Sequence, residues 1–229
     1  RKFGGYVPAD RQWDPSSVFT ITILNKEPMM TARYRPILMV IGLLFGMNVM
    51  CQTATWNFNY VMAMPFGDTK DWVDDFSFRG FSIDGNSFVE ENISLGGSMA
   101  WQGFYERRDN VLINLENADI YGTQFRYLNS FNVTFDAHYH FGQPYGIRPY
   151  IGAGIGPYYV SQRGDLGLWS LLWEGWHFGM RADAGVYVPF NNSDYGLNLG
   201  VKYHHILKRK ESPYDLQYLA FNIGLLHMI

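Results

Sequence analysis

The chain has 229 residues, a formal net charge of −3, and equal shares of aromatic and charged residues at 17% each. Soluble domains carry about 25% charged residues, and nucleic-acid-binding proteins carry basic patches, so neither class fits this composition. A mean hydropathy of −0.16 excludes a bundle of membrane helices.

The N-terminal part of the chain predicts export. Residues 30–51 resemble a secretory signal peptide, with basic residues at Arg33 and Arg35 before the short apolar run PILMVIGLLFG. That run is too short for a spanning helix, which needs about 20 residues. Lipid attachment at Cys51 is the alternative. Residues 1–29 are interpreted as an over-extended gene prediction without structure, and residues 52–229 as the mature domain, which contains no cysteine for a disulfide.

The mature part contains eight segments in which every second residue is bulky and apolar. This period of two predicts β-strands. The intervening positions hold glycine, serine, asparagine, histidine and a few charges instead of the many charges of a soluble sandwich. The segments have about the 9 to 11 residues with which a tilted strand crosses a bilayer. They are residues 55–65, 80–88, 93–104, 131–141, 148–159, 176–188, 195–205 and 219–229.

The connections between these segments alternate in length. Long connections are expected at residues 66–75, 105–122, 160–175 and 207–215. Short connections with turn-forming residues lie between them. Outer-membrane barrels have short periplasmic turns and longer outer loops. We therefore predict an all-β, eight-stranded, antiparallel up-and-down transmembrane β-barrel in the outer membrane.

Charged side chains among these strands are expected inside the barrel. A lysine such as Lys202 would cost about 2–4 kcal/mol on the lipid face near the bilayer midplane. Side chains fill an eight-stranded barrel, so a large channel is not expected. His138 and His140 share one face, but no third metal ligand is identifiable, and we predict neither metal nor cofactor. The predicted interior polar network is Asp136, His138, His140, Arg148, His177, Arg181, Asp183 and Lys202.

The chain resembles the outer-membrane β-barrel domain family typified by the transmembrane domain of outer membrane protein A, and most of all the small barrels of the Bacteroidota. The resemblance rests on RPYIGAGIGPYY at 148–159, FDAHYHF, GLNLGVKYHH and the final YLAFNIGLLHMI. It implies a last strand that the barrel-assembly machinery reads. Asn222, Gly224 and Ile229 match that pattern, whereas His227 departs from it. Periplasmic chaperones and outer-membrane lipid are the implied partners of a monomer.

The outer connection at 164–176 is unusually apolar. It predicts a surface-binding loop for a host protein, a glycan or another surface ligand; the alternative is that its tryptophans belong to a membrane girdle. No nucleophile motif surrounds Ser130 or Ser161, so we predict no enzyme; a lipid-modifying barrel enzyme or a narrow small-solute pore is the alternative. The candidate binding residues are Leu168, Trp169, Leu171, Leu172 and Trp173.

Overall fold

The computed structural model describes residues 54–115, 118–143, 146–167, 169–191, 193–208 and 215–229. The predicted signal peptide at 30–51, the segment 1–29 before it, and Leu168 of the predicted binding loop lie outside the described residues. None of the helices among the described residues is both long and apolar enough to cross a membrane.

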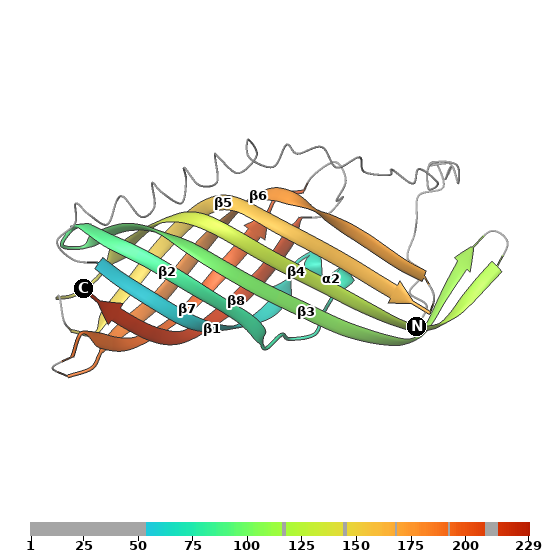
Figure 1. Cartoon of the computed structure of the whole chain (residues 1–229), viewed down its shortest axis with the longest axis horizontal. Coiled ribbons are helices and arrows are strands. Elements are labelled where there is room, and N and C mark those ends of the chain that lie inside the picture. Colours follow the sequence, from blue (N-terminus) through green and yellow to red (C-terminus); the bar gives the residue numbers. More distant parts are fainter. Residues whose placement is uncertain (1–53, 116–117, 144–145, 168, 192, 209–214) are drawn as a thin grey trace, which may run out of the picture. The chain divides into compact units, whose positions relative to one another are not determined.

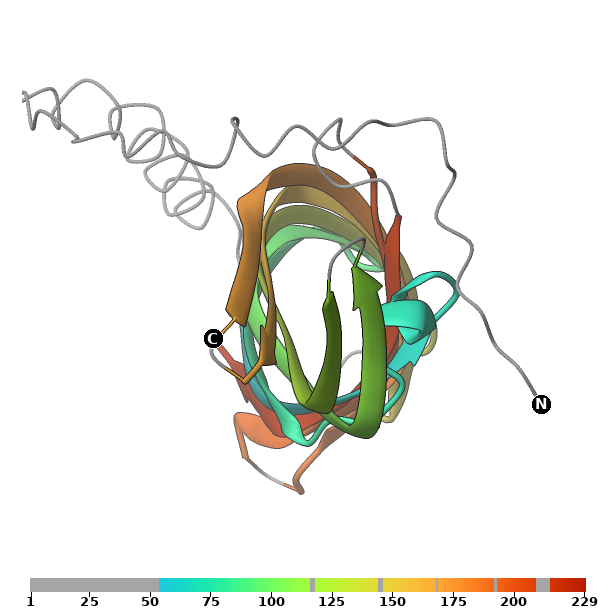
Figure 2. The ribbon, with the colours of Figure 1, turned by 90° about the vertical axis from the view of Figure 1, so that its right-hand side faces the viewer.

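Eight strands form a closed ring in which each strand pairs antiparallel with the next, and the last pairs with the first. Figure 2 looks into this ring from one end. The predicted all-β, eight-stranded up-and-down barrel is confirmed. The strands are β1 Ala54–Phe66, β2 Arg79–Glu90, β3 Ile93–Leu115, β4 Ala118–His140, β5 Arg148–Leu166, β6 Trp169–Pro189, β7 Tyr195–Ile206 and β8 Leu216–Met228, and the short helix α2 spans Thr69–Trp72.

The two ends of the barrel differ. The short turns after β2, β4 and β6 lie at the end where the chain stops, and there Ile229 pairs with Ala54 through backbone hydrogen bonds. The opposite end carries α2 and the hairpins β3–β4 and β5–β6, which extend well beyond the other strands (Figure 1). These four strands have 19 to 23 residues, whereas the other four have 12 or 13.

Two of the predicted long loops are wrong. The described residues of 105–122 and 160–175 continue the strands, and their ladders run out to the pairs Leu115–Ala118 and Leu166–Trp169. Their neighbours β2 and β7 end earlier, so the extensions form a four-stranded sheet that we call the outer wall. This sheet lies beyond the part of the barrel whose outer surface is apolar. Its outward-facing positions are therefore not regularly apolar, and the alternation that marks a strand in the sequence is missing.

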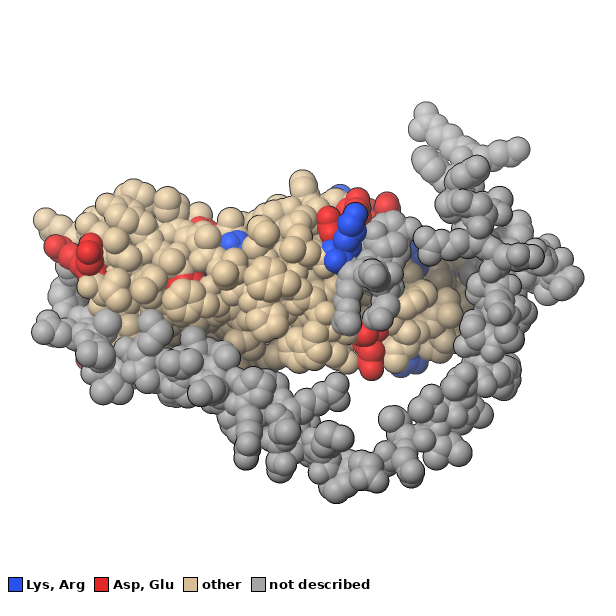
Figure 3. All heavy atoms as spheres, turned by 90° about the horizontal axis from the view of Figure 1, so that it is seen from above, with Lys and Arg blue, Asp and Glu red and all other residues tan. Residues whose placement is uncertain are grey.

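The outer surface of the barrel is apolar. Phe135, Leu199 and Ile223 are exposed on it, while the polar residues beside them face inward and are buried, namely Thr134, Asp136, Asn198 and Asn222. Charged atoms on the face seen in Figure 3 gather mostly toward the ends. On this surface one aromatic row crosses five strands through consecutive register partners, and the outer wall lies beyond it: Phe81, Trp101, Phe131, Tyr159 and Trp176.

Candidate functional site

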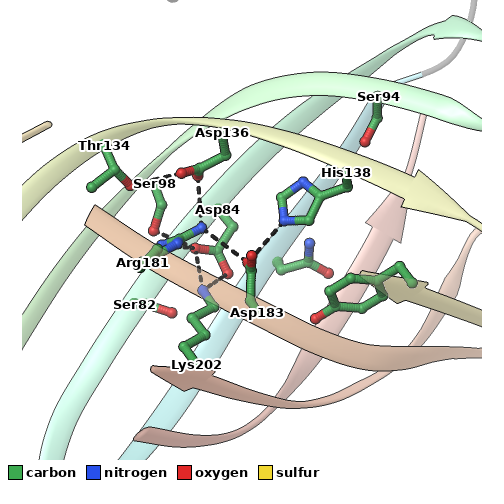
Figure 4. Close-up of polar contacts among 12 residues, drawn as sticks. Ser82, Asp84, Ser94, Ser98, Thr134, Asp136, His138, Arg181, Asp183 and Lys202 are labelled. Atoms are coloured by element: carbon green, nitrogen blue, oxygen red, sulfur yellow. Dashed lines mark hydrogen bonds and ion pairs between the residues drawn. The ribbon is translucent and has the colours of Figure 1, made fainter. Parts of the chain in front are cut away.

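The centre of the barrel holds an interior ion cluster contributed by four strands. Its members are buried and point toward one another across the lumen (Figure 4). Because they come from β2, β4, β6 and β7, they connect walls that are not neighbours in the sheet. The cluster consists of Asp84, Asp136, His138, Arg181, Asp183 and Lys202.

Lys202 is neutralised by Asp84. Its Nζ lies 2.8 Å from both carboxylate oxygens. Asn59 donates a further hydrogen bond of 2.8 Å to Oδ2 of the same carboxylate, and the Ser98 hydroxyl donates to Oδ1. Asp84 was not among the predicted network residues. The signal for it was present, because Asp84 follows Ser82 on the inward side of β2, between the outward-facing Ile83 and Gly85.

Arg181 connects the three carboxylates. Its Nη2 donates to Asp136 Oδ2 at 2.7 Å and to Asp183 Oδ2 at 3.3 Å, and its Nη1 lies 4.0 Å from Asp84 Oδ1. Thr134 donates a second hydrogen bond to Asp136 at 2.8 Å. Each buried carboxylate therefore has a cationic partner, as buried charges require.

His138 completes the cluster through Asp183. Its Nε2 lies 2.9 Å from Asp183 Oδ2. The cluster thus sets three carboxyl groups against one guanidinium, one ammonium and one imidazole. The cluster therefore has a composition that a low-dielectric interior tolerates.

The glycines of β5 make room for this cluster. A Cβ built on Gly154 would lie 2.1 Å from Asp136 Oδ1, and one on Gly152 would lie 2.2 Å from the His138 ring. A Cβ on Gly156 would lie 2.1 Å from the Val133 carbonyl oxygen. The spacing of glycines in RPYIGAGIGP thus follows from close approach to β4.

Three predicted network residues are not brought into the ion cluster. His140 lies nearer the short turns, where its Nε2 is 2.9 Å from Ser94 Oγ. Arg148 donates to the Glu91 carbonyl oxygen of the β2–β3 turn and packs over the Phe88 ring. His177 is half-buried at the other end, with its Nδ1 3.2 Å from the Leu207 carbonyl oxygen.

An apolar layer lies between the ion cluster and the outer end. Tyr158 and Tyr218 are fully buried there, and His204 stacks on the Tyr218 ring while its Nδ1 is 3.0 Å from the Tyr158 hydroxyl. Toward the short turns, Tyr150 and Tyr187 pack against each other around His140. The lumen is therefore filled with side chains above and below the charges.

Helix α2 closes the outer mouth over this layer. Thr69 is buried and accepts the Gln217 backbone N–H of β8 at 2.6 Å. Trp72 reaches the opposite wall, where its Nε1 donates to the Tyr127 carbonyl oxygen of β4 at 3.3 Å and its ring meets Trp173 of β6 edge-on. A helix that contacts opposite strands in this way must lie across the lumen.

Replacing Trp72 by alanine should open this closure. Loss of a half-buried indole should cost about 2 kcal/mol, less than the 3–5 kcal/mol of a fully buried tryptophan. Cleavage by trypsin after Lys70 should become faster in the folded protein. Trp169→Ala is the matched control because that side chain is exposed. Equal cleavage rates in both variants would contradict the sealing role of α2.

The His138–His140 pair does not form a metal site with its surroundings. Among the described residues, no group of three or more His, Cys, Asp and Glu side chains is arranged to hold a metal ion. The Ser94–His140 contact also lacks the third member of a catalytic triad within the described part of the chain, where His140 Nδ1 has no hydrogen-bond partner. Ser94 itself is fully buried. A substrate has no access to such a serine.

The outer wall has two edges without a neighbouring strand. Within the described residues, β3 from Phe104 outward pairs only with β4, and β6 from Trp169 to Phe178 pairs along its ladder only with β5. Hydrogen bonds from Thr123 and Arg107 hold the pKa of Asp109 at the wall's outer part below its ordinary value. The wall thus presents both backbone edges and ionised groups.

The predicted surface-binding residues lie on β6 instead of in a loop. Trp169 is 68% exposed and Leu172 is 56% exposed. Side chains alternate along the strand, so Leu172 points outward whereas Trp169, Leu171 and Trp173 point to the side of the lumen. The described residues of the group therefore form two surfaces, one on each face of the wall.

The predicted assembly signal lies on the strand that closes the barrel. Asn222 is buried inside, and Ile229 is exposed at the end. Gly224 permits close pairing, because a Cβ there would lie 2.3 Å from both the Asn59 side-chain oxygen and the Phe58 carbonyl oxygen of β1. His227, which departs from the pattern, stacks on Tyr195 of β7, with 4.7 Å between the two ring centres.

Comparisons with known proteins find similarity in structure only. No protein-family model and no curated protein matches the chain. Ail, the attachment invasion locus protein of Yersinia pestis, is 9% identical with a TM-score of 0.49, over 79% of this chain and 100% of that chain. Neisserial surface protein A is 13% identical with a TM-score of 0.48, over 76% and 96%. The N-terminal β-barrel domain of Pseudomonas aeruginosa OprF is 13% identical with a TM-score of 0.45, over 78% and 98%. These likenesses concern the fold alone.

Proposed function

We propose that this chain is an integral outer-membrane protein with a sealed interior, and that its outer wall binds a ligand at the cell surface. The membrane assignment rests on the surface of the ring. An exposed apolar band surrounds it, and the described charged side chains at mid-height lie inside it. Such a surface is unfavourable in water and suits hydrocarbon. The short turns then face the periplasm and the outer wall faces outward.

Several partners belong to this proposal. Outer-membrane lipid surrounds a monomer, periplasmic chaperones deliver the chain, and the barrel-assembly machinery reads Asn222, Gly224 and Ile229. The resemblance to small Bacteroidota barrels and the signal peptide at 30–51 remain predictions. An enzymatic role has less support, since no described serine combines exposure with a histidine and a carboxylate.

The folded barrel should run faster on gels than the boiled protein, and it should come from the outer-membrane fraction. In planar bilayers it should show no stable large conductance, because the apolar layer and the ion cluster fill the lumen. A boiling-independent mobility would contradict the membrane barrel. A stable large conductance would instead overturn the sealed interior and favour the pore alternative.

The surface-binding role is tested by shortening one hairpin. Replacing residues 164–171 by Asn-Gly closes β5–β6 on the Arg163–Leu172 pair with a tight turn. Adhesion of cells that display this variant to epithelial cells should fall severalfold. Shortening the β3–β4 hairpin is the matched control, because it removes part of the outer wall and keeps Trp169 and Leu171. Unchanged adhesion in the β5–β6 variant would remove the binding role.

A further inference from the structure

Arginines on the outward face continue the apolar band just beyond the aromatic row. On β2, Arg79 is the next outward-facing residue after Phe81 in the direction of the outer wall. On β5, Arg163 is the second outward-facing residue after Tyr159 in the same direction. Both are exposed. Given the strand rise and a barrel tilt near 40°, these positions lie about 5 and 10 Å above the aromatic row. That is the depth of lipid headgroups.

Aromatic rings support these guanidinium groups. The Cζ of Arg79 lies 5.7 Å from the Tyr105 ring centre, and the Cζ of Arg163 lies 6.0 Å from that of Tyr127. Arg107 repeats the arrangement one level higher, 6.0 Å from the Phe125 ring centre. Cation–π contacts of this kind orient the planar guanidinium along the surface of the sheet.

The two acids near Arg163 each have a hydrogen-bond partner. Asp165 is the next outward-facing residue on β5 after Arg163. It accepts from Arg163 Nε at 2.9 Å and also has a hydrogen bond with Ser170. Among the described residues, the terminal Nη nitrogens of Arg163 make no hydrogen bond. Glu174, which lies closer to the aromatic row, is engaged by the Tyr159 hydroxyl. The donor edge of Arg163 is therefore available to a ligand coming from the bilayer side.

We infer that Arg79 and Arg163, with Arg107 above them, bind phosphate groups of anionic lipid headgroups in the leaflet around the outer wall. This rests on the membrane orientation proposed above. The ligand is a lipid because the arginines share one face with the apolar residues of the band and lie only one or two outward-facing positions beyond the aromatic row. Arginine matches phosphate by paired N–H donors. The overall negative charge of the chain argues against nucleic acid.

Lipid exchange at the aromatic row tests this binding. The protein is reconstituted in brominated phosphatidylcholine, which quenches exposed tryptophans such as Trp176, and lipid A is added to displace the quencher. Each basic residue at an anionic surface contributes about 1 kcal/mol, which corresponds to about fivefold in affinity. The Arg79→Gln/Arg163→Gln variant should therefore bind lipid A about 25-fold more weakly relative to phosphatidylcholine.

The matched control is Arg108→Gln/Arg126→Gln, which makes the same change of charge on the lumen side of β3 and β4. It should keep the lipid A preference of the unaltered protein. Equal preference in the Arg79/Arg163 variant and the control would overturn the inference. If soluble inorganic phosphate abolishes the preference for lipid A, the site binds free phosphate, and a lipid as its ligand is contradicted.

Two further outcomes separate this inference from the proposed function. If brominated lipid quenches no tryptophan, the chain is not inserted and the membrane assignment itself fails. If the Arg79/Arg163 variant does not fold, a salt series on the unaltered protein decides. Its lipid A preference should fall severalfold as salt screens the contacts, whereas a salt-independent preference would contradict them.

Discussion

Replacing Asp84 by alanine should lower the free energy of unfolding by about 3 to 5 kcal/mol, because Lys202 would remain buried without its partner. Both Lys202–carboxylate contacts are 2.8 Å long, and Asp84 also lies 4.0 Å from Arg181. Urea unfolding of the barrel in phospholipid vesicles, followed by tryptophan fluorescence, measures the loss.

A second substitution separates a missing partner from simple loss of packing. Asp84→Ala/Lys202→Met removes both charges of the pair and should recover most of the lost stability, since a buried ion pair contributes little relative to apolar residues. Asp109→Ala at the exposed part of the outer wall is the control and should leave the urea midpoint unchanged. A double variant as unstable as Asp84→Ala would refute the neutralising role of Asp84.

Replacing Gly154 by valine should destabilise the barrel by about 3 kcal/mol or more, because added atoms have no space in a packed interior. Even a Cβ at this position would lie 2.1 Å from Asp136 Oδ1 and 3.2 Å from the Phe135 carbonyl oxygen. The same urea titration reports the change.

The adjacent Ala153→Val provides the control for this prediction. Ala153 points outward on the same strand and is exposed, so an added side chain meets lipid and should change the free energy of unfolding by less than about 0.5 kcal/mol. Gly154→Ala combined with Asp136→Ala should cost less than the sum of the two single changes, because one clash is removed. Equal destabilisation at both positions would show that β5 is sensitive to any enlargement.

The alternation of residues was enough to predict the barrel and the side of each strand on which a residue lies. Lys202, Arg181 and Asp183 face inward as their spacing indicated. The partners could not be predicted in the same way. Asp84 contacts Lys202 across 118 positions of sequence, and only the register of the closed ring brings them together. His140 shares a face with His138 but lies at another height, with Ser94.

The outer wall could not be recognised because its strands lack the environment that creates the pattern. In the band, one face meets hydrocarbon and the other a narrow interior, so polarity alternates. Beyond the aromatic row the inward face stays buried at Phe104, Leu128 and Val160. The outward face mixes polar residues such as Arg107 and Asn129 with Tyr105 and Phe125, so the alternation is lost. Such segments have the composition of loops, and their strand structure depends on pairing within each hairpin.

The ion cluster also constrains how the barrel is made. Its members come from the second, fourth, sixth and seventh strands, so no single hairpin contains a complete set of opposite charges. A partly inserted sheet that lacks β6 and β7 would expose Asp84 to hydrocarbon without its cationic partners Arg181 and Lys202. Folding therefore favours a pathway in which nearly all strands align while they are still in contact with water or a chaperone. The closed ring then inserts into the bilayer.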